Sequence, residues 1–237
     1  KIVGAYYGYM WAFGSYDGAS TSHVALARVL ASEYIDFIAS PINYNERILG
    51  MSTTFMSMLD TVQLYGKLYL LEQDNRSFMS TSYSGSTWDA SWDYQVGGYH
   101  TAYETMCQFK RDFVHNFVDG SGYWNYDMYG GWLDDPQIYE FMAQSKSIYD
   151  FSLTLESRKF TNDVAIFMSD NYYSYLSVDD EYNSTYILTS SLLAEQRENL
   201  NRMGTGYDTY TMSSLAQGLV PEHKVNIFIS NFETCSK

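Results

Sequence analysis

One carboxylate in the 237-residue chain is placed where an enzyme would hold a reactive group. Glu72 ends the apolar run 67–73 and opens the polar cluster Glu72-Gln73-Asp74-Asn75-Arg76. A strand that stops at a carboxylate holds it rigidly, which suits a nucleophile or a general acid and base. Glycoside hydrolysis uses two carboxylates, about 5–5.5 Å apart when configuration is retained. Glu72 is therefore the candidate nucleophile, and the alternative is an ion pair with Arg76 or Arg47.

Side chains that commonly bind sugars occur throughout the same region. Aromatic faces stack on the apolar face of a sugar ring, while Asp, Asn and Arg contact its hydroxyl groups. Asp74 points the same way as Glu72 if the strand continues, and Asp127 suits a sugar hydroxyl or a helix cap equally. The alternative for the tryptophans is ordinary core packing. The candidate substrate-binding residues are Trp11, Arg47, Asp74, Arg76, Trp88, Trp92, Asp127 and Trp132.

The sequence holds no motif for a metal or a cofactor. The four histidines are scattered without ligand spacing, the acidic segment 179–181 lacks a calcium-loop pattern, and no Gly-rich phosphate loop or CxxC pair occurs. We therefore expect neither a metal nor a cofactor. Cys107 is either a small buried residue of a helix or the disulfide partner of Cys235 or of sequence outside the chain.

Composition narrows the class of protein. Hydrophobic residues make up 46% and charged residues 18%, as in a globular chain. The net charge of −14 repels phosphate backbones and anionic lipid surfaces, so neither nucleic acid nor a membrane is an expected partner. No apolar run reaches the roughly 18 residues of a spanning helix. The 24 tyrosines are unusual.

Two Asn-x-Ser/Thr sequons favour secretion of a glycoprotein. They begin at Asn183, the stronger glycosylation candidate, and at Asn75, the weaker one. The small number of lysines and the abundance of Tyr and Ser favour the same location. We therefore expect an extracellular protein.

Strand-like and helical runs alternate in residues 1–157. Strands are expected at 1–9, 34–40, 67–73 and 123–128, and helices from Ser22 and at 99–118 and 137–152, the last with Asp135 as N-cap and Pro136 at its first position. Each strand ends in polar residues before a loop, which is typical of βα units on a parallel sheet. A doubly wound sheet and a (β/α)8 barrel both fit. Long acidic and aromatic loops favour the barrel, of which four units are half.

The pattern of strand-like runs and loops changes after this region, and it predicts a second α/β domain at 158–237. Strands are expected at 164–168, 207–210 and 225–230, with a helix at 188–203 and a helical turn at 214–217. The chain opens on one strand and stops after another, so we expect a segment of a longer polypeptide. A half barrel leaves sheet edges unpaired, and we expect the isolated segment to aggregate.

Several stretches resemble the β-galactosidase-like glycoside hydrolases of family 42. They are residues 34–47 (YIDFIASPINYNER), 60–76 (DTVQLYGKLYLLEQDNR), 122–135 (GYWNYDMYGGWLDD) and the region 207–230. The resemblance covers most of the chain. It implies the second half of a TIM (β/α)8 barrel followed by part of a flavodoxin- or glutamine-amidotransferase-like α/β trimerisation domain.

Under this resemblance the first four strands are the fifth to eighth of the barrel. Glu72 then occupies the place of the family's nucleophile, at the end of the seventh strand. The acid/base Glu belongs after the fourth strand and is expected outside these residues; the pair Asn45-Glu46 follows the sixth strand and is not assigned. Asp74-Asn75-Arg76-Ser77 stands where relatives have Asp-x-Arg-Thr, a mild departure, and the richness in Tyr, Met and Ser suggests a diverged member of the family.

Three hypotheses about function follow. The first is a retaining, β-galactosidase-like enzyme that acts on a carbohydrate by double displacement and forms a homo-oligomer, such as a trimer, through its second domain. The second is a non-catalytic secreted structural or glycan-binding protein on the same scaffold, without a carboxylate in reach of Glu72. The third is a doubly wound α/β protein of another function, with an open sheet.

Overall fold

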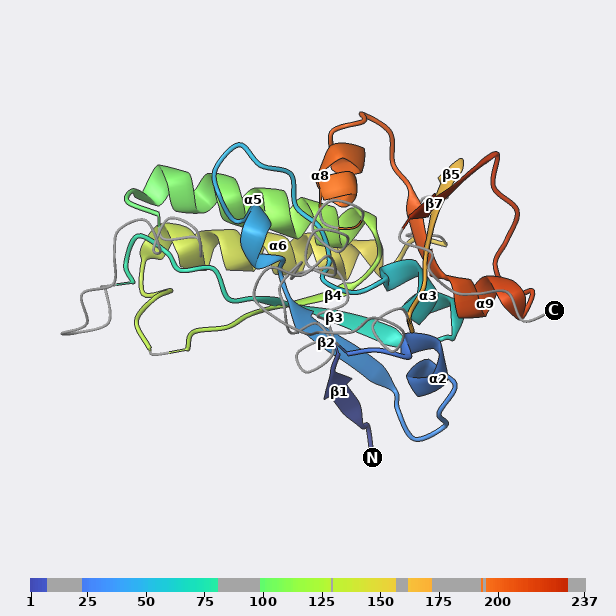
Figure 1. The fold of residues 1–237 in the computed structure, drawn as a ribbon. Helices are drawn as coiled ribbons and strands as arrows, with labels where there is room; N and C mark the ends of the chain where they lie inside the picture. Colours follow the sequence, from blue (N-terminus) through green and yellow to red (C-terminus); the bar gives the residue numbers. More distant parts are fainter. Residues whose placement is uncertain are drawn as a thin grey trace, which may run out of the picture. The chain divides into compact units, whose positions relative to one another are not determined.

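The computed structural model describes residues 1–7, 23–80, 99–128, 130–156, 162–171, 193 and 195–229 (Figure 1). Within them the strands form two parallel sheets, one of four strands in the order β1-β2-β3-β4 and one of three in the order β6-β5-β7. The predicted α/β class is confirmed. A barrel is not shown by these residues and stays a prediction.

The four-stranded sheet follows the order of the chain. Its strands are β1 (Gly4–Tyr6), β2 (Phe37–Pro41), β3 (Leu68–Gln73) and β4 (Gly122–Asn125). The helices that alternate with them are α2 (Leu26–Leu30), α3 (Leu59–Leu64), α5 (Ala102–Val118) and α6 (Pro136–Ser152). Glu72 pairs in register with Trp124 and Gln73 with Asn125. The predicted repetition of βα units is thus present.

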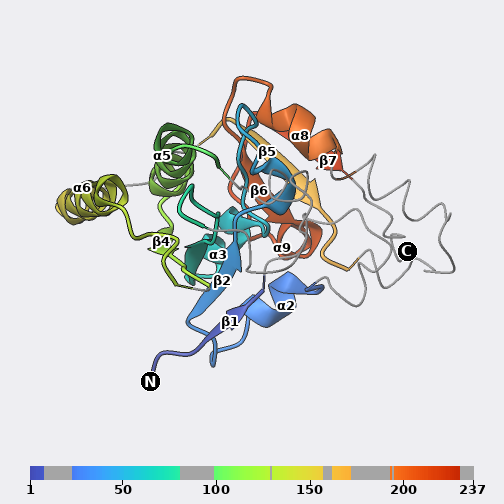
Figure 2. The same ribbon diagram turned by 90° about the vertical axis from the view of Figure 1, so that its left-hand side faces the viewer.

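Helices α5 and α6 run side by side, as Figures 1 and 2 both show, and they enclose an aromatic core. Helix α5 begins with a capping box between Thr101 and Glu104. The predicted start of α6 is confirmed, because the Asp135 carboxylate accepts from the Gln137 backbone N–H at 2.8 Å and Pro136 follows the cap. The core contains Met106, Phe109, Phe113, Ile138 and Phe141.

Helix α5 exposes Cys107, which was expected to be a small buried residue or a disulfide partner. Tyr103 is 78% exposed, and Cys107 and Val114 are exposed as well, so the expectation of a buried Cys107 is wrong. Its thiol is free, and Cys235 lies outside the described residues. The buried face combines the aromatic core with a polar stripe, which consists of Gln108, Asp112 and Asn116 at intervals of four residues.

Helix α2 begins later than expected, at Leu26. Its N-cap is Ala25, in the left-handed conformation (φ 60°), and the expected cap Ser22 lies outside the described residues. The Asp170 carboxylate accepts from the Ala27 N–H at 3.0 Å, so a residue 143 positions away caps this helix. Strand β4 also ends at Asn125 rather than at 128.

The three-stranded sheet consists of β5 (Val164–Met168), β6 (Asp208–Thr211) and β7 (Val225–Ile229). Its helices are α8 (Glu195–Asn201) and α9 (Met212–Ala216). The central strand β5 is buried at every residue, as expected of a strand covered on both faces. The Phe167 ring stacks on Phe228 with centroids 5.0 Å apart.

Helix α3, which the sequence did not predict, lies along the outer edge of β6. The Asp60 carboxylate accepts from the backbone N–H of Thr209 at 2.6 Å. The Thr61 hydroxyl accepts from the N–H of Thr211 at 3.0 Å. Two amide groups of an edge strand are thus satisfied by side chains of a helix.

Contacts divide the chain into two compact units. One comprises 1–40, 55–69 and 161–237, and the other comprises 41–54 and 70–160. The predicted division at 157/158 stays a prediction. Within the described residues, none of the helices combines the length and the apolar character that crossing a bilayer requires.

Candidate active site

The end of β3 presents polar side chains on both faces of the sheet. Asn75 Nδ2 donates to Asp112 Oδ2 of α5 at 2.7 Å, and Gln73 Nε2 lies 3.4 Å from the same oxygen. Because neighbouring residues of a strand point to opposite faces, Glu72 lies on the face away from α5. The strand ends at Gln73, one residue before Asp74. Glu72 is 6% exposed. Its carbonyl oxygen accepts from the Ile42 N–H at 3.3 Å, which ties β3 to the end of β2.

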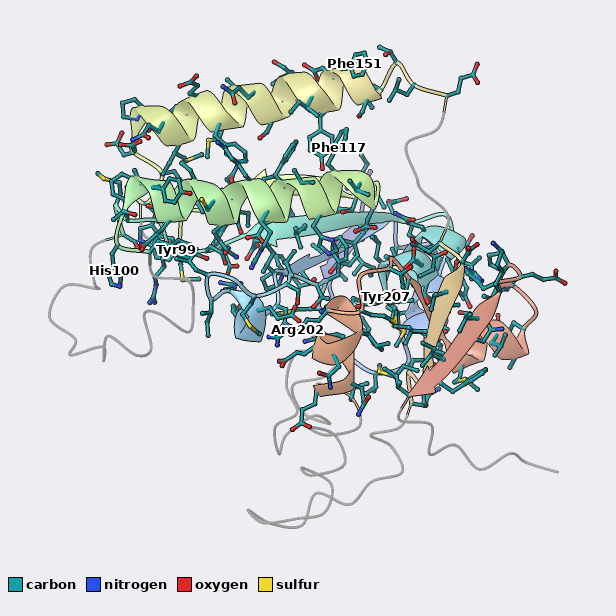
Figure 3. All side chains as sticks on the ribbon, turned by 90° about the horizontal axis from the view of Figure 1, so that it is seen from above. Tyr99, His100, Phe117, Phe151, Arg202 and Tyr207 are labelled. Carbon is teal, nitrogen blue, oxygen red and sulfur yellow. The ribbon has the colours of Figure 1, made fainter. Side chains whose placement is uncertain are left out.

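Asp74 and Arg47 form a buried ion pair, with side chains 6% and 2% exposed. Arg47 Nη2 also donates to the Ile42 carbonyl at 2.9 Å, and its guanidinium lies 4.1 Å from the centroid of the Tyr44 ring. The Tyr99 hydroxyl, just before α5 (Figure 3), donates to the Arg47 carbonyl at 2.8 Å. Two of the predicted substrate-binding residues therefore contact each other.

A second buried carboxylate follows the neighbouring strand β2. Glu46 lies in the short 3-10 helix η1 (Tyr44–Glu46) and is fully buried. The Thr54 hydroxyl donates to its Oε2. Glu72 thus lies at the carboxyl end of β3 and Glu46 lies shortly after that of β2. The carboxyl ends of parallel strands are where α/β proteins place reactive groups. The sequence showed the pair Asn45-Glu46 but gave no reason to assign it.

Asp127 organises its own loop instead of capping a helix. Its carboxylate accepts from the N–H of Gly130 at 2.8 Å and from that of Trp132 at 3.0 Å. Gly130 has a φ of +82°, a conformation that glycine adopts readily. Trp132 is buried; the Ser77 hydroxyl donates to its carbonyl, and the Arg76 guanidinium lies 5.8 Å from its ring. Three predicted substrate-binding residues thus form one cluster, Arg76-Asp127-Trp132.

Four of the predicted residues fall in parts of the chain that the structure does not describe. They are Trp11, Trp88, Trp92 and Asn183. Asn75 is fully buried and its amide nitrogen donates to Asp112, so a glycan on this nitrogen is incompatible with the folded chain. Among the described residues, no group of three or more His, Cys, Asp or Glu side chains could hold a metal ion.

The sequence did not identify Asp112, the fully buried carboxylate beneath the end of β3. Arg111 donates to its Oδ1 through Nε at 2.9 Å and Nη2 at 2.8 Å. Burial raises the pKa of Asp112, and the positive charges of Arg111 and Arg47 oppose that rise. The sequence carries no local signal for this burial, because polar residues at four-residue intervals on a helix normally indicate its solvent-facing side.

Asp112 also affects Tyr123 of β4. Burial, then the negative charge of Asp112, then Tyr149 raise the pKa of Tyr123 well above its ordinary value. The phenol therefore stays protonated at neutral pH. Its ring packs edge-on against Phe113 with centroids 5.8 Å apart, so it belongs to the aromatic core between α5 and α6.

Comparison with known proteins gives no relative. No protein-family description, no curated protein and no solved structure matches the chain. Function is therefore argued from the geometry of the site.

His115, one turn beyond Arg111 on α5, makes stability depend on pH. Burial, followed by the charge of Arg111, lowers its pKa to about 4, below the ordinary value of 6.5. As the pH falls, His115 binds a proton in the unfolded chain before it does so in the folded chain. The free energy of unfolding is therefore highest above pH 6.5 and falls as the pH drops towards 4. We expect the free energy of unfolding to fall by about 1–2 kcal/mol, less than the roughly 3 kcal/mol that corresponds to the full pKa shift. The reason is that the His115 side chain is 30% exposed and the Asp119 carboxylate lies 3.1 Å from its ring.

Urea unfolding at pH 7 and pH 4 measures this effect. The His115→Gln variant should lose less stability than the wild type between these pH values, by the 1–2 kcal/mol expected above. Equal losses in the two proteins would show that His115 does not contribute.

Proposed function

We propose that this chain carries the nucleophile of a retaining, β-galactosidase-like glycoside hydrolase, and that Glu72 is this nucleophile. The observation that carries the proposal is the place of Glu72. It is a buried carboxylate at the carboxyl end of a parallel strand, on the sheet face opposite the helix α5. The barrel and the family-42 relationship belong to the same proposal.

The proposed reaction has two steps. A Glu72 carboxylate oxygen attacks the anomeric carbon, the bond to the leaving-group oxygen breaks, and a general acid protonates that oxygen. Water, deprotonated by the same group, then attacks the covalent glycosyl-enzyme and releases the sugar with Glu72 restored. We assign the acid/base role to a Glu outside these residues. Glu46 is fully buried and accepts from Thr54, so it is given no role in proton transfer.

The surrounding side chains support binding of a polar ring substrate. The Arg47–Asp74 pair fixes the loop after β2 against the end of β3, beside Glu72. The Arg76-Asp127-Trp132 cluster fixes the loops after β3 and β4 to one another. In this proposal the Arg47–Asp74 pair and the Arg76-Asp127-Trp132 cluster shape the walls of the site. Trp11, Trp88 and Trp92, which lie outside the described residues, are proposed to supply aromatic faces for the sugar.

Trapping of the covalent intermediate tests the proposal. The full-length polypeptide is incubated with a 2-deoxy-2-fluoro-galactoside bearing a good leaving group, since the fluorine slows the second step more than the first. We expect mass spectrometry to find the sugar on the peptide that contains Glu72, and Glu72→Gln to lose both turnover and labelling. The matched control is Glu140→Gln, an exposed glutamate of α6, which should keep both.

Undiminished turnover in Glu72→Gln, or labelling of a different carboxylate, would contradict the assignment. Sugar binding without any turnover in the wild type would indicate the second hypothesis, a non-catalytic glycan-binding protein. Secretion with a glycan at Asn183 is a further part of the proposal, and treatment of the secreted protein with a glycan-removing enzyme checks it. Assembly into homo-oligomers is another part, and light scattering checks it.

A further inference from the structure

Asp112 is the point at which three segments of the chain meet. It belongs to α5, it accepts from Asn75 and lies within 3.4 Å of Gln73 at the end of β3, and it binds Arg111. Arg111 Nη1 in turn donates to the carbonyl of Met51, in the loop after β2, at 2.7 Å. A single buried carboxylate thus connects a helix, a strand end and a loop.

The residues held by Asp112 alternate with the residues of the candidate site. Gln73 follows Glu72, and Asn75 follows Asp74. Asp74, which stands between Gln73 and Asn75, is held by Arg47. The end of β3 and the two residues after it are therefore held by two buried groups, Asp112 and Arg47, and Glu72 directly precedes the residues that they hold.

A neutral residue would not hold the strand end equally well. The two carboxylate oxygens of Asp112 accept from Arg111 on one side and from amide N–H groups on the other. Hydrogen bonds to an ionised acceptor are roughly twice as strong as neutral ones. An asparagine at this place would offer one oxygen and would turn an NH₂ group towards other donors.

We propose that Asp112 is a positioning residue, which holds the end of β3 so that the Glu72 carboxylate points in the productive direction. This inference rests on the proposed function for the role of Glu72. The attachment of the strand end is a property of the chain whether or not the site is catalytic.

Hydrogen–deuterium exchange and kinetics test the proposal together, in the full-length polypeptide. We expect the Asp112→Asn variant to exchange the amides of residues 70–76 roughly 10- to 100-fold faster than the wild type, because the local opening becomes easier. We also expect kcat to fall roughly 10- to 100-fold with little change in KM, since misdirecting a nucleophile affects the transition state and not the binding of the sugar.

The matched control is Asn116→Ala, one turn further along the same helix. Asn116 is fully buried as well, but it donates to the carbonyl of Ser121 at 3.2 Å and to Tyr149 rather than to the end of β3. It should lower the melting temperature while leaving exchange at 70–76 and kcat unchanged. A further variant, Asn75→Ala, removes only one bond of Asp112 and keeps its pairing with Arg111. It should speed the hydrogen exchange of the same amides, 70–76, to a smaller extent.

The outcomes are separable. Unchanged exchange at 70–76 in Asp112→Asn overturns the inference, and if that variant does not fold, unchanged exchange in Asn75→Ala overturns it. Faster exchange at 70–76 together with a higher KM and an unaltered kcat also overturns the inference. Faster exchange in a protein whose wild type shows no turnover supports the attachment of the strand end by Asp112 and removes the proposed function instead.

Discussion

Replacing Arg47 with Met is expected to lower the free energy of unfolding by about 3–5 kcal/mol, the typical cost of removing one partner of a buried ion pair. The cost arises because Asp74, only 6% exposed, keeps its negative charge without the guanidinium. The variant also loses the contact with the Tyr44 ring at 4.1 Å and the hydrogen bond to Ile42. Chemical denaturation in urea measures the change.

A double variant separates the charge effect from the packing effect. Arg47→Met with Asp74→Leu removes both charges, and it should be more stable than Arg47→Met alone, since a buried pair replaced by apolar residues is often neutral in cost. The control is Arg28→Met, an exposed arginine of α2, which should change stability by less than about 0.5 kcal/mol. A loss below about 1 kcal/mol in Arg47→Met would show that Asp74 is solvated.

Replacing Phe113 with Ala is expected to cost about 3–5 kcal/mol, in the range of large cavities in aromatic cores. Phe113 is almost fully buried between α5 and α6, and its ring centroid lies 5.5–5.8 Å from those of four other aromatic rings. These partners are Phe117, Tyr123, Phe141 and Tyr149. Figure 3 shows Phe117 between the two helices. Thermal and urea unfolding measure the loss.

The matched control lies on α6. Phe151, near the end of that helix in Figure 3, is 65% exposed, so Phe151→Ala should change stability by less than about 0.5 kcal/mol. Phe113→Leu should lie between the two, since it keeps part of the volume. A loss in Phe113→Ala no larger than that in Phe151→Ala would mean that α5 and α6 do not pack as described.

The elements that local signals determine could be predicted from the sequence. The start of α6 at Asp135-Pro136 depends on capping chemistry within three residues, and it is found where expected. The strand β5 is apolar at every position and has its predicted bounds. Alternation of such elements was enough to predict a parallel α/β arrangement.

Elements that depend on distant partners were missed or misplaced. Helix α3 is short, and its N-cap Met58 offers no side-chain hydrogen bond. Asp60 and Thr61 of α3 instead bond to β6, about 150 positions later. Helix α2 likewise takes its cap from Asp170. No pattern within either segment shows a contact of this kind.

The same distinction holds for the candidate site. The end of β3 at Glu72 and Gln73 could be predicted from the change from apolar to polar residues. Asp112 could not, because a charged residue on an amphipathic helix is normally assigned to the solvent side. Its burial depends on Asn75 and Gln73, which a helical pattern does not contain.

The bonds from α3 to β6 have a consequence for any attempt to cut the chain into pieces. A fragment that begins near residue 158 would carry all three strands of the second sheet but would lack Asp60 and Thr61. The amide groups of Thr209 and Thr211 would then face water or a second copy of the fragment. For expression and refolding, the second sheet therefore needs residues of α3, which lies between β2 and β3 in the sequence. A single cut in the chain cannot yield a fragment that holds the second sheet with these residues and leaves out the first sheet.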